Sequence, residues 1–169
     1  ESQSENFCLE AANYNCPGQL VLSGTTTAID WAKNNINDYD FGPEVKKVRL
    51  IPLKVSAPFH SKLMKPAEEV MAKFLENIEI SSPAFPIVQN VNAQAFNATD
   101  KIKNSLIAQI SGSVLWTQSI KKINQTLTEP KSFVEVGSGT TLSGLIKKID
   151  SSEINLFNTN QLSSVREFE

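Results

Sequence analysis

Strands and helices alternate along the chain from about residue 83 onward, and this pattern limits the possible folds more than any other feature. Short apolar runs at 86–91, 132–136 and 154–157 have the length and composition of buried strands. Segments whose apolar residues recur every three or four positions lie between or beside them, at 102–110, 115–123 and 142–149. This alternation predicts an α/β fold with mainly parallel strand pairing.

The first 55 residues have a different pattern, typical of a smaller α+β unit. Residues 19–23 form a short apolar run that ends at Gly24, and the threonines at 25–27 can cap a helix that continues to Asn35. Residues 48–55 are again apolar and predict a strand. Since Pro52 cannot donate a hydrogen bond, we expect that strand at a sheet edge or with a bulge.

The segment from 63 to 78 has the strongest helical periodicity in the chain. Its apolar residues recur at spacings of three and four: Leu63, Ala67, Val70, Met71, Phe74 and Ile78. Pro66 fits the first turn, where a missing N–H costs little. We expect this apolar stripe to face a core.

Composition excludes several classes of protein. The chain has 169 residues, 40% hydrophobic and 20% charged, which is ordinary for one globular domain with at most a small appendage. It has no run of about 20 apolar residues and no visible signal peptide, so we expect a cytoplasmic protein without a membrane span. Two cysteines, Cys8 and Cys16, and one histidine, His60, are too few for a Cys/His zinc site, and we interpret both thiols as reduced.

Charge is unevenly distributed although the net charge is only −2. Residues 1–45 carry seven acidic side chains and one lysine, whereas residues 101–149 carry seven lysines and two glutamates. Only two arginines are present, which argues against nucleic-acid binding. The lysines fit either a solvated helical surface, the interpretation the pattern favours, or a docking face for an acidic protein or a phosphorylated ligand.

Two features could carry chemistry. His60 is the side chain best suited to move a proton near neutral pH, but a single histidine is more often structural. The glycines of Gly137-Ser138-Gly139 predict a tight strand-to-helix turn, with a phosphate-binding loop as the weaker alternative. The chain contains no Gly-x-Ser-x-Gly motif that would place a serine nucleophile.

Four segments together carry a resemblance to a known family. They are residues 13–24 (NYNCPGQLVLSG), 55–66 (VSAPFHSKLMKP), 133–139 (FVEVGSG) and 142–148 (LSGLIKK). In this order they resemble the malonyl-CoA:acyl-carrier-protein transacylases of bacterial type II fatty-acid synthesis. The resemblance covers almost the whole chain and depends on the combination of motifs.

The resemblance implies a role for six residues. His60 matches the catalytic histidine, the general base for a serine, and Gln109 matches the glutamine whose backbone carbonyl orients that histidine. Phe59 matches the residue that narrows the acyl pocket in many malonyl-selective members. Three further residues match polar positions near the acyl site, although holding loop backbone would explain them equally well: Asn15, Gln19 and Asn90.

The resemblance also implies what lies outside the chain. The family's nucleophilic serine, its oxyanion hole and the arginine for the malonyl carboxylate belong upstream of Asn13 and are not in this sequence. The family fold is an α/β-hydrolase-like acyltransferase core with an inserted ferredoxin-like subdomain. The chain is therefore expected to contain part of that subdomain at 1–56 and the C-terminal part of the core at 57–169.

The implied reaction is malonyl transfer from malonyl-CoA to the phosphopantetheine thiol of acyl carrier protein. Its expected partners are malonyl-CoA, acyl carrier protein and the N-terminal half of the same enzyme. Thioester exchange requires a nucleophile, a base and an oxyanion hole, so no metal or other cofactor is expected. Two alternatives remain: a non-catalytic fragment that binds carrier protein or a separate N-terminal chain, and an acyltransferase domain of a polyketide synthase.

Overall fold

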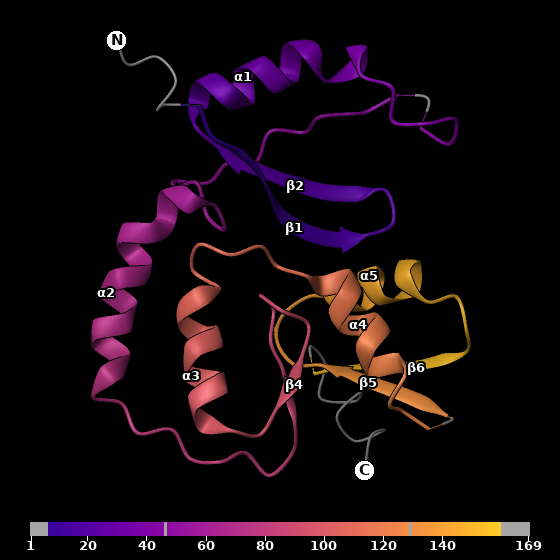
Figure 1. The fold of residues 1–169 in the computed structure, drawn as a ribbon. Helices are drawn as coiled ribbons and strands as arrows, with labels where there is room; N and C mark the ends of the chain where they lie inside the picture. The colour runs from indigo at the N-terminus through magenta and orange to yellow at the C-terminus, as the bar shows by residue number, and fades with distance from the viewer. Residues whose placement is uncertain (1–6, 46, 129, 160–169) are drawn as a thin grey trace.

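A computed structural model describes residues 7–45, 47–128 and 130–159, and it shows a mixed α/β fold (Figure 1). Its strands form three two-stranded pairs within these residues, two antiparallel and one parallel. Helices lie beside each pair (Figure 1). The predicted α/β class is therefore confirmed, whereas the predicted parallel pairing holds for one of the two pairs that follow residue 83.

The N-terminal unit is a β-hairpin followed by a helix. Strands β1 (Leu9–Cys16) and β2 (Gln19–Gly24) pair antiparallel, and helix α1 (Thr26–Asn35) follows at once. Thr25 caps α1 as the sequence predicts, because its Oγ1 accepts a hydrogen bond from the backbone N–H of Ala28 at 3.4 Å. The sequence did not predict β1, since its polar and apolar residues do not alternate regularly.

The histidine region connects this unit to a helical pair. A short 3₁₀ turn η2 (Lys62–Met64) leads into helix α2 (Lys65–Glu76), which packs against helix α3 (Thr99–Ala108). The predicted position of Pro66 in the first turn of α2 is confirmed. Between the two helices the chain forms a minimal antiparallel pair of β3 (Ile87–Val88) and β4 (Ala95–Phe96).

The C-terminal unit contains the parallel pair. Helix α4 (Trp116–Asn124) precedes strand β5 (Lys131–Glu135), and β5 pairs with β6 (Ile154–Asn158) through a crossover helix α5 (Thr141–Ile149). The carboxylate of Glu135 fixes the start of α5, because it accepts hydrogen bonds from the backbone N–H groups of Leu142 and Ser143. The predicted strand-to-helix turn at 137–139 is thus present, with both glycines at positive φ.

Strand β1 is tied to a segment about 100 residues later in the sequence. Backbone hydrogen bonds join Val114 to Ala12 and Tyr14, at 2.7 and 2.9 Å. The side chain of Ser113 adds a bond to the carbonyl oxygen of Ala11 at 2.6 Å. These contacts place the segment between α3 and α4 alongside the hairpin.

The predicted strand at 48–55 is wrong. Residues 47–55 form no strand, and the side chains of Ile51 and Val55 are 66% and 63% exposed. An apolar run forms a strand only where a neighbouring strand accepts its backbone hydrogen bonds, and none of the described strands pairs with it.

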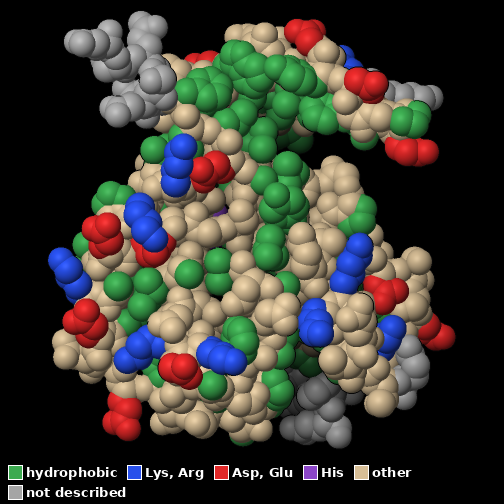
Figure 2. All heavy atoms as spheres, in the orientation of Figure 1, with side chains coloured by type: hydrophobic (Ala, Val, Ile, Leu, Met, Phe, Trp, Pro, Cys, Tyr) green, Lys and Arg blue, Asp and Glu red, His purple; other side chains and the backbone are tan. Residues whose placement is uncertain are grey.

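The apolar stripe of α2 also differs from the expectation. Val70 and Phe74 are 68% and 66% exposed, and α2 contains no buried residue. The stripe is present as predicted, but the described residues do not cover it. Hydrophobic side chains also gather in the region of α1 (Figure 2). Within the described residues, Phe7 and Tyr39 pack edge-on against Trp31 of α1.

None of the helices within the described residues is both long enough and apolar enough to cross a bilayer.

Candidate functional site

The site is centred on His60, which lies in the turn before α2 with an unusual backbone conformation. Its φ angle is +57°, in the left-handed region that non-glycine residues rarely adopt. Such a residue costs about 1–3 kcal/mol and persists where the surrounding structure fixes it. Here Ser61 fixes the turn, because it is fully buried and its hydroxyl donates to the carbonyl oxygen of Pro58 at 2.7 Å.

Two backbone carbonyls hold the imidazole. The Nδ1 atom of His60 is 2.9 Å from the carbonyl oxygen of Gln109 and 3.1 Å from that of Gly112. Carbonyl oxygens only accept hydrogen bonds, so in the neutral ring Nδ1 carries the proton. The Nε2 atom is then left with its lone pair available to accept a proton.

The end of α3 explains why these carbonyls are available. Gln109 is the C-cap of α3, and the last carbonyls of a helix have no partner within it. The chain then turns tightly, with the N–H of Gly112 donating to the carbonyl of Ala108 at 2.9 Å. A Cβ atom on Gly112 would lie only 2.6 Å from Val91 Cγ2 and 2.9 Å from the Ala108 oxygen, so the turn requires glycine.

Asn90 is the third candidate residue in the cluster around His60 and Gln109. Its side-chain Nδ2 donates to Gln109 Oε1 at 3.3 Å, and its carbonyl accepts from the N–H of Leu115 at 2.8 Å. Asn90 therefore holds both ends of the 109–115 segment. The structure brings together His60, Gln109 and Asn90 from three separate parts of the sequence.

The other three candidate residues form no hydrogen bond to His60, Gln109 or Asn90 within the described part of the chain. Phe59 directly precedes His60, and the residue is 48% exposed. Gln19 begins β2 and accepts from Cys16 Sγ across the hairpin turn at 3.6 Å. Asn15 lies at an irregularity in the register of β1, between Tyr14 and Cys16. No side-chain hydrogen bond among the described residues joins Asn15 or Gln19 to His60.

Sequence reasoning missed Gly112 and two residues beside it, Ser111 and Glu68. Ser111 Oγ donates to Glu68 Oε2, which links the carbonyl turn to α2. A glycine shortly after a predicted helix is a signal that could have indicated the turn. Nothing in the sequence distinguishes Glu68 from the other charged residues of its helix.

Neither cysteine offers a nucleophile in the described structure. Cys8 and Cys16 are both buried and unpaired with each other. Burial, with Glu10 nearby, raises the pKa of the Cys8 thiol, so the reactive thiolate is disfavoured. The described residues also contain no cluster of three or more His, Cys, Asp or Glu side chains that could hold a metal ion.

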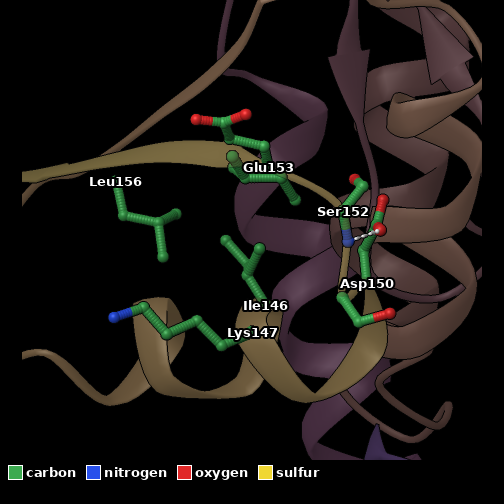
Figure 3. A pocket seen from close by; sticks show the side chains of 8 residues that line it. Ile146, Lys147, Asp150, Ser152, Glu153 and Leu156 are labelled. Atoms are coloured by element: carbon green, nitrogen blue, oxygen red, sulfur yellow. Dashed lines mark hydrogen bonds between the residues drawn. The ribbon is translucent and has the colours of Figure 1, made fainter.

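A separate pocket of about 290 Å³ lies between α5 and β6 (Figure 3). One of its polar groups, the Asp150 carboxylate, already has partners: it accepts from the Ser152 N–H at 2.8 Å and from Asn124 Nδ2 at 2.6 Å. Ile146 and Leu156 line it on either side (Figure 3). This pocket contains none of the candidate residues, and we assign it no function.

Comparisons with known proteins give a consistent result. No family model matches the chain. It is 39% identical over 147 residues to malonyl CoA-acyl carrier protein transacylase of Bacillus subtilis, covering 86% of this chain and 44% of that protein. The corresponding Staphylococcus aureus protein is 39% identical over 148 residues, which are 87% of this chain and 45% of its own length. The chain thus spans less than half the length of these relatives.

Solved structures agree with the sequence comparison. An acyl carrier protein S-malonyltransferase from Vibrio cholerae superposes with a TM-score of 0.85 at 31% identity, covering 98% of this chain and 51% of that one. A malonyl-transacylase in complex with a type II PKS acyl-carrier protein superposes with a TM-score of 0.84 at 30% identity, covering 96% and 50%. The structural similarity extends over nearly all of this chain and about half of each neighbour.

Proposed function

The chain is homologous to malonyl CoA-acyl carrier protein transacylases over about half of their length, and we propose that it is the C-terminal part of such an enzyme and supplies its general base. One observation carries this proposal. His60 Nδ1 faces two carbonyl oxygens, which leaves Nε2 as a proton acceptor in a defined orientation. A base held in this way is what acyl transfer through a serine ester requires.

The reaction then proceeds in two half-reactions. His60 Nε2 takes the proton of a serine, supplied by polypeptide outside these residues, as the serine oxygen attacks the malonyl-CoA thioester. The CoA thiolate leaves and takes that proton from the imidazolium. The phosphopantetheine thiol of acyl carrier protein next gives its proton to Nε2 and attacks the malonyl ester, and the serine oxygen recovers the proton as it leaves.

The carbonyls of Gln109 and Gly112 have a specific role in this scheme. Each accepts from Nδ1–H, so together they fix one ring tautomer and stabilise the imidazolium that forms in each half-reaction. They take the position that a carboxylate occupies in a serine–histidine–aspartate triad. We also assign Phe59, which is adjacent to His60 and half exposed, to contact with the acyl group.

The finer assignments from the sequence are part of the same proposal. We assign residues 1–56 to a ferredoxin-like subdomain and 57–169 to an α/β-hydrolase-like core, in a cytoplasmic enzyme. The hairpin with α1 and the parallel pair crossed by α5 are compatible with that division. Asn15, Gln19 and Asn90 are assigned to the surroundings of the acyl site.

Exposed apolar side chains support the proposed N-terminal half as a partner. Large hydrophobic residues on α2 and in the segment before it are more than half exposed: Ile51, Leu53, Val55, Val70 and Phe74. Patches of this kind normally mark a surface that another part of a protein covers. The relatives are more than twice as long as the matched segment, so the remaining polypeptide is long enough to cover it.

The test is malonyl transfer from malonyl-CoA to acyl carrier protein by the full-length polypeptide that carries this chain. His60→Asn should lower kcat by about 10²–10⁴-fold, because asparagine tolerates the left-handed backbone but cannot act as the base. The isolated 169-residue chain should be inactive, since it has no Gly-x-Ser-x-Gly motif.

The outcome also decides between the alternatives. A full-length protein that binds carrier protein but transfers no malonyl group would support the non-catalytic fragment instead. Parallel assays with carrier proteins of fatty-acid and polyketide synthesis would identify the preferred acceptor. One structural neighbour is described in complex with a type II PKS acyl-carrier protein, so both acceptors need to be assayed.

A further inference from the structure

The segment that bears His60 is stiff from the histidine into α2. The N–H of Lys62 donates to Glu10 Oε2 at 2.8 Å, and the N–H of Met64 donates to the carbonyl of Ser61 at 2.9 Å. Helix α2 follows without a break. Glu68 lies in the first turn of α2, so its position relative to His60 is set by this continuous structure.

Glu68 points back to the turn that holds the imidazole. Its Oε2 accepts from the hydroxyl of Ser111, and Ser111 lies between Gln109 and Gly112, the two residues whose carbonyls accept from His60. The other carboxylate oxygen accepts from Lys65 Nζ. The Glu68 side chain is only 12% exposed, whereas that of Lys65 is 59% exposed.

These contacts connect the same two segments twice. The imidazole joins residue 60 to residues 109 and 112, and the carboxylate joins residue 68 to residue 111. A rotation about the backbone at Ser111 would turn the Gly112 carbonyl away from Nδ1, and the bond to Glu68 opposes it. A hydrogen bond to a charged acceptor is stronger than one between neutral groups, so this restraint is firm.

We propose that Glu68, acting through the Ser111 hydroxyl, is a positioning residue that holds the Gln109 and Gly112 carbonyls on His60 Nδ1. This inference rests on the proposed function of His60 as the general base. Glu68 itself touches none of the reacting groups. Its pKa is held below the usual range by the hydrogen bonds from Lys65 and Ser111, which keeps the acceptor ionised at neutral pH.

Kinetics of variants in the full-length polypeptide give the first test. Ser111→Ala and Glu68→Met should each lower kcat by about tenfold or more with little change in KM, because misplacing a catalytic group by 1 Å can cost about 10²-fold. Ser111→Thr, which keeps the hydroxyl, should retain most of the activity. The double variant should lose little more than either single variant, since both break one link.

Glu69→Gln is the matched control. It changes the neighbouring glutamate of the same helix, which is exposed, and should leave kcat unchanged. Lys65→Met should have a small effect, since it leaves the Ser111–Glu68 bond in place. If Lys65→Met lowers kcat as much as Ser111→Ala does, the ion pair and not the link to the turn is responsible, and the proposal is overturned.

The ring tautomer gives a second test that needs no enzymatic activity. The ¹⁵N shifts of the His60 ring, assigned by their loss in His60→Asn, report which nitrogen carries the proton at a pH where imidazole is neutral. The parent protein should show the Nδ1–H tautomer, and Ser111→Ala and Glu68→Met should shift the ring toward a mixture. If the full-length protein transfers no malonyl group but the tautomers are as expected, the proposed function is refuted. The positioning link between Glu68 and the carbonyl turn would still stand.

The proposal is overturned if Ser111→Ala and Glu68→Met both leave the His60 tautomer unchanged. This holds if kcat is retained, and also if kcat falls only in proportion to the loss of folded protein measured by circular dichroism.

Discussion

The Nδ1 atom of His60 lies 2.9 Å from the carbonyl oxygen of Gln109, although 49 residues separate the two in sequence. The contact uses the backbone of Gln109, and its side chain serves a different purpose by accepting from Asn90. Substitutions at this position can therefore separate the backbone role from the side-chain role.

In the full-length polypeptide, Gln109→Ala should keep most of the proposed malonyl-transfer activity, whereas Gln109→Pro should lower it by well over tenfold. Alanine preserves the carbonyl and removes one hydrogen bond worth about 1 kcal/mol. Proline removes the N–H that donates to the Ser105 carbonyl at 3.0 Å, and its ring crowds that carbonyl, which displaces the end of α3. The measurement is kcat per folded enzyme, with folding followed by circular dichroism.

Gln125 provides a matched control, because it is the C-cap of α4 with a similar backbone conformation. Gln125→Pro should cost stability without a comparable loss of kcat. Equal activity losses from the two proline variants would contradict the assigned role of the Gln109 carbonyl.

Gly112→Ala should lower both stability and activity. Its new Cβ would lie 2.9 Å from the Ala108 carbonyl oxygen and 2.6 Å from Val91 Cγ2, so the backbone that presents the Gly112 carbonyl has to shift. Overpacking of this kind typically costs about 1–3 kcal/mol. Adding Val91→Ala removes the side-chain clash alone and should restore only part of the loss, as measured by urea unfolding and kcat.

Gly144→Ala is the corresponding control in a helix. Apart from its chain neighbours and the backbone of its own helix, nothing lies within 4 Å of a Cβ built there, and the position is exposed within α5. The substitution should stabilise the protein by about 0.5–1 kcal/mol, because alanine restricts the unfolded chain and favours the helix. A destabilised Gly144→Ala variant would show that the packing around α5 differs from the structure described.

Glu135→Gln should destabilise the protein at neutral pH by about 1 kcal/mol, because the carboxylate caps the start of α5. The hydrogen bond from the Ser143 hydroxyl, followed by those from the Ser143 and Leu142 N–H groups, lowers the pKa of Glu135 below its ordinary value of 4.5. The ionised form is thus favoured by folding. Its stabilisation is present above pH 4.5 and is lost as the pH falls through the lowered pKa of the folded state.

Urea unfolding at neutral pH and near pH 3 measures this effect. The difference between the parent and Glu135→Gln should shrink at the lower pH. The exposed Glu153→Gln should change stability little at either pH. A difference for Glu135→Gln that is independent of pH would mean that the carboxylate charge does not contribute.

The sequence predicted those parts of the fold that depend on local patterns. Helices α2 to α5 repeat apolar residues at helical spacing, and β5 and β6 are apolar runs flanked by turns, so each was found within a few residues. The segment 48–55 was assigned wrongly, because a strand also needs a partner that local composition does not reveal.

The candidate site, like the fold, was predicted only in part. His60 and Gln109 were identified through the family resemblance and lie in contact. Gly112 and Ser111 were not identified, because a backbone carbonyl has no side-chain signal and a serine after a helix is common. Glu68 was also missed, since its partner is 43 residues away and the pairing exists only once α2 packs beside α3.

Lys121 and Lys122, in the last turn of α4, are the residues we expect to contact acyl carrier protein. Both are exposed, and Lys147 and Lys148 occupy the last turn of α5, which packs against α4. Replacing both α4 lysines with glutamate should raise the KM for carrier protein by roughly three- to tenfold and leave that for malonyl-CoA unchanged, since rim charges act on association.

The charge reversal also weakens the favourable interaction of lysine with the end of the helix, by about 0.3–1 kcal/mol per residue. Lys73→Glu, in the last turn of α2, serves as a control for that effect and should leave both KM values unchanged.

The salt dependence of the KM for carrier protein gives an independent measurement. This KM should depend less on salt in the α4 double variant, because fewer attractive charge pairs remain for salt to screen. If the double variant raises both KM values equally, or changes neither, these lysines are ordinary solvated surface, and the carrier protein docks on a different face.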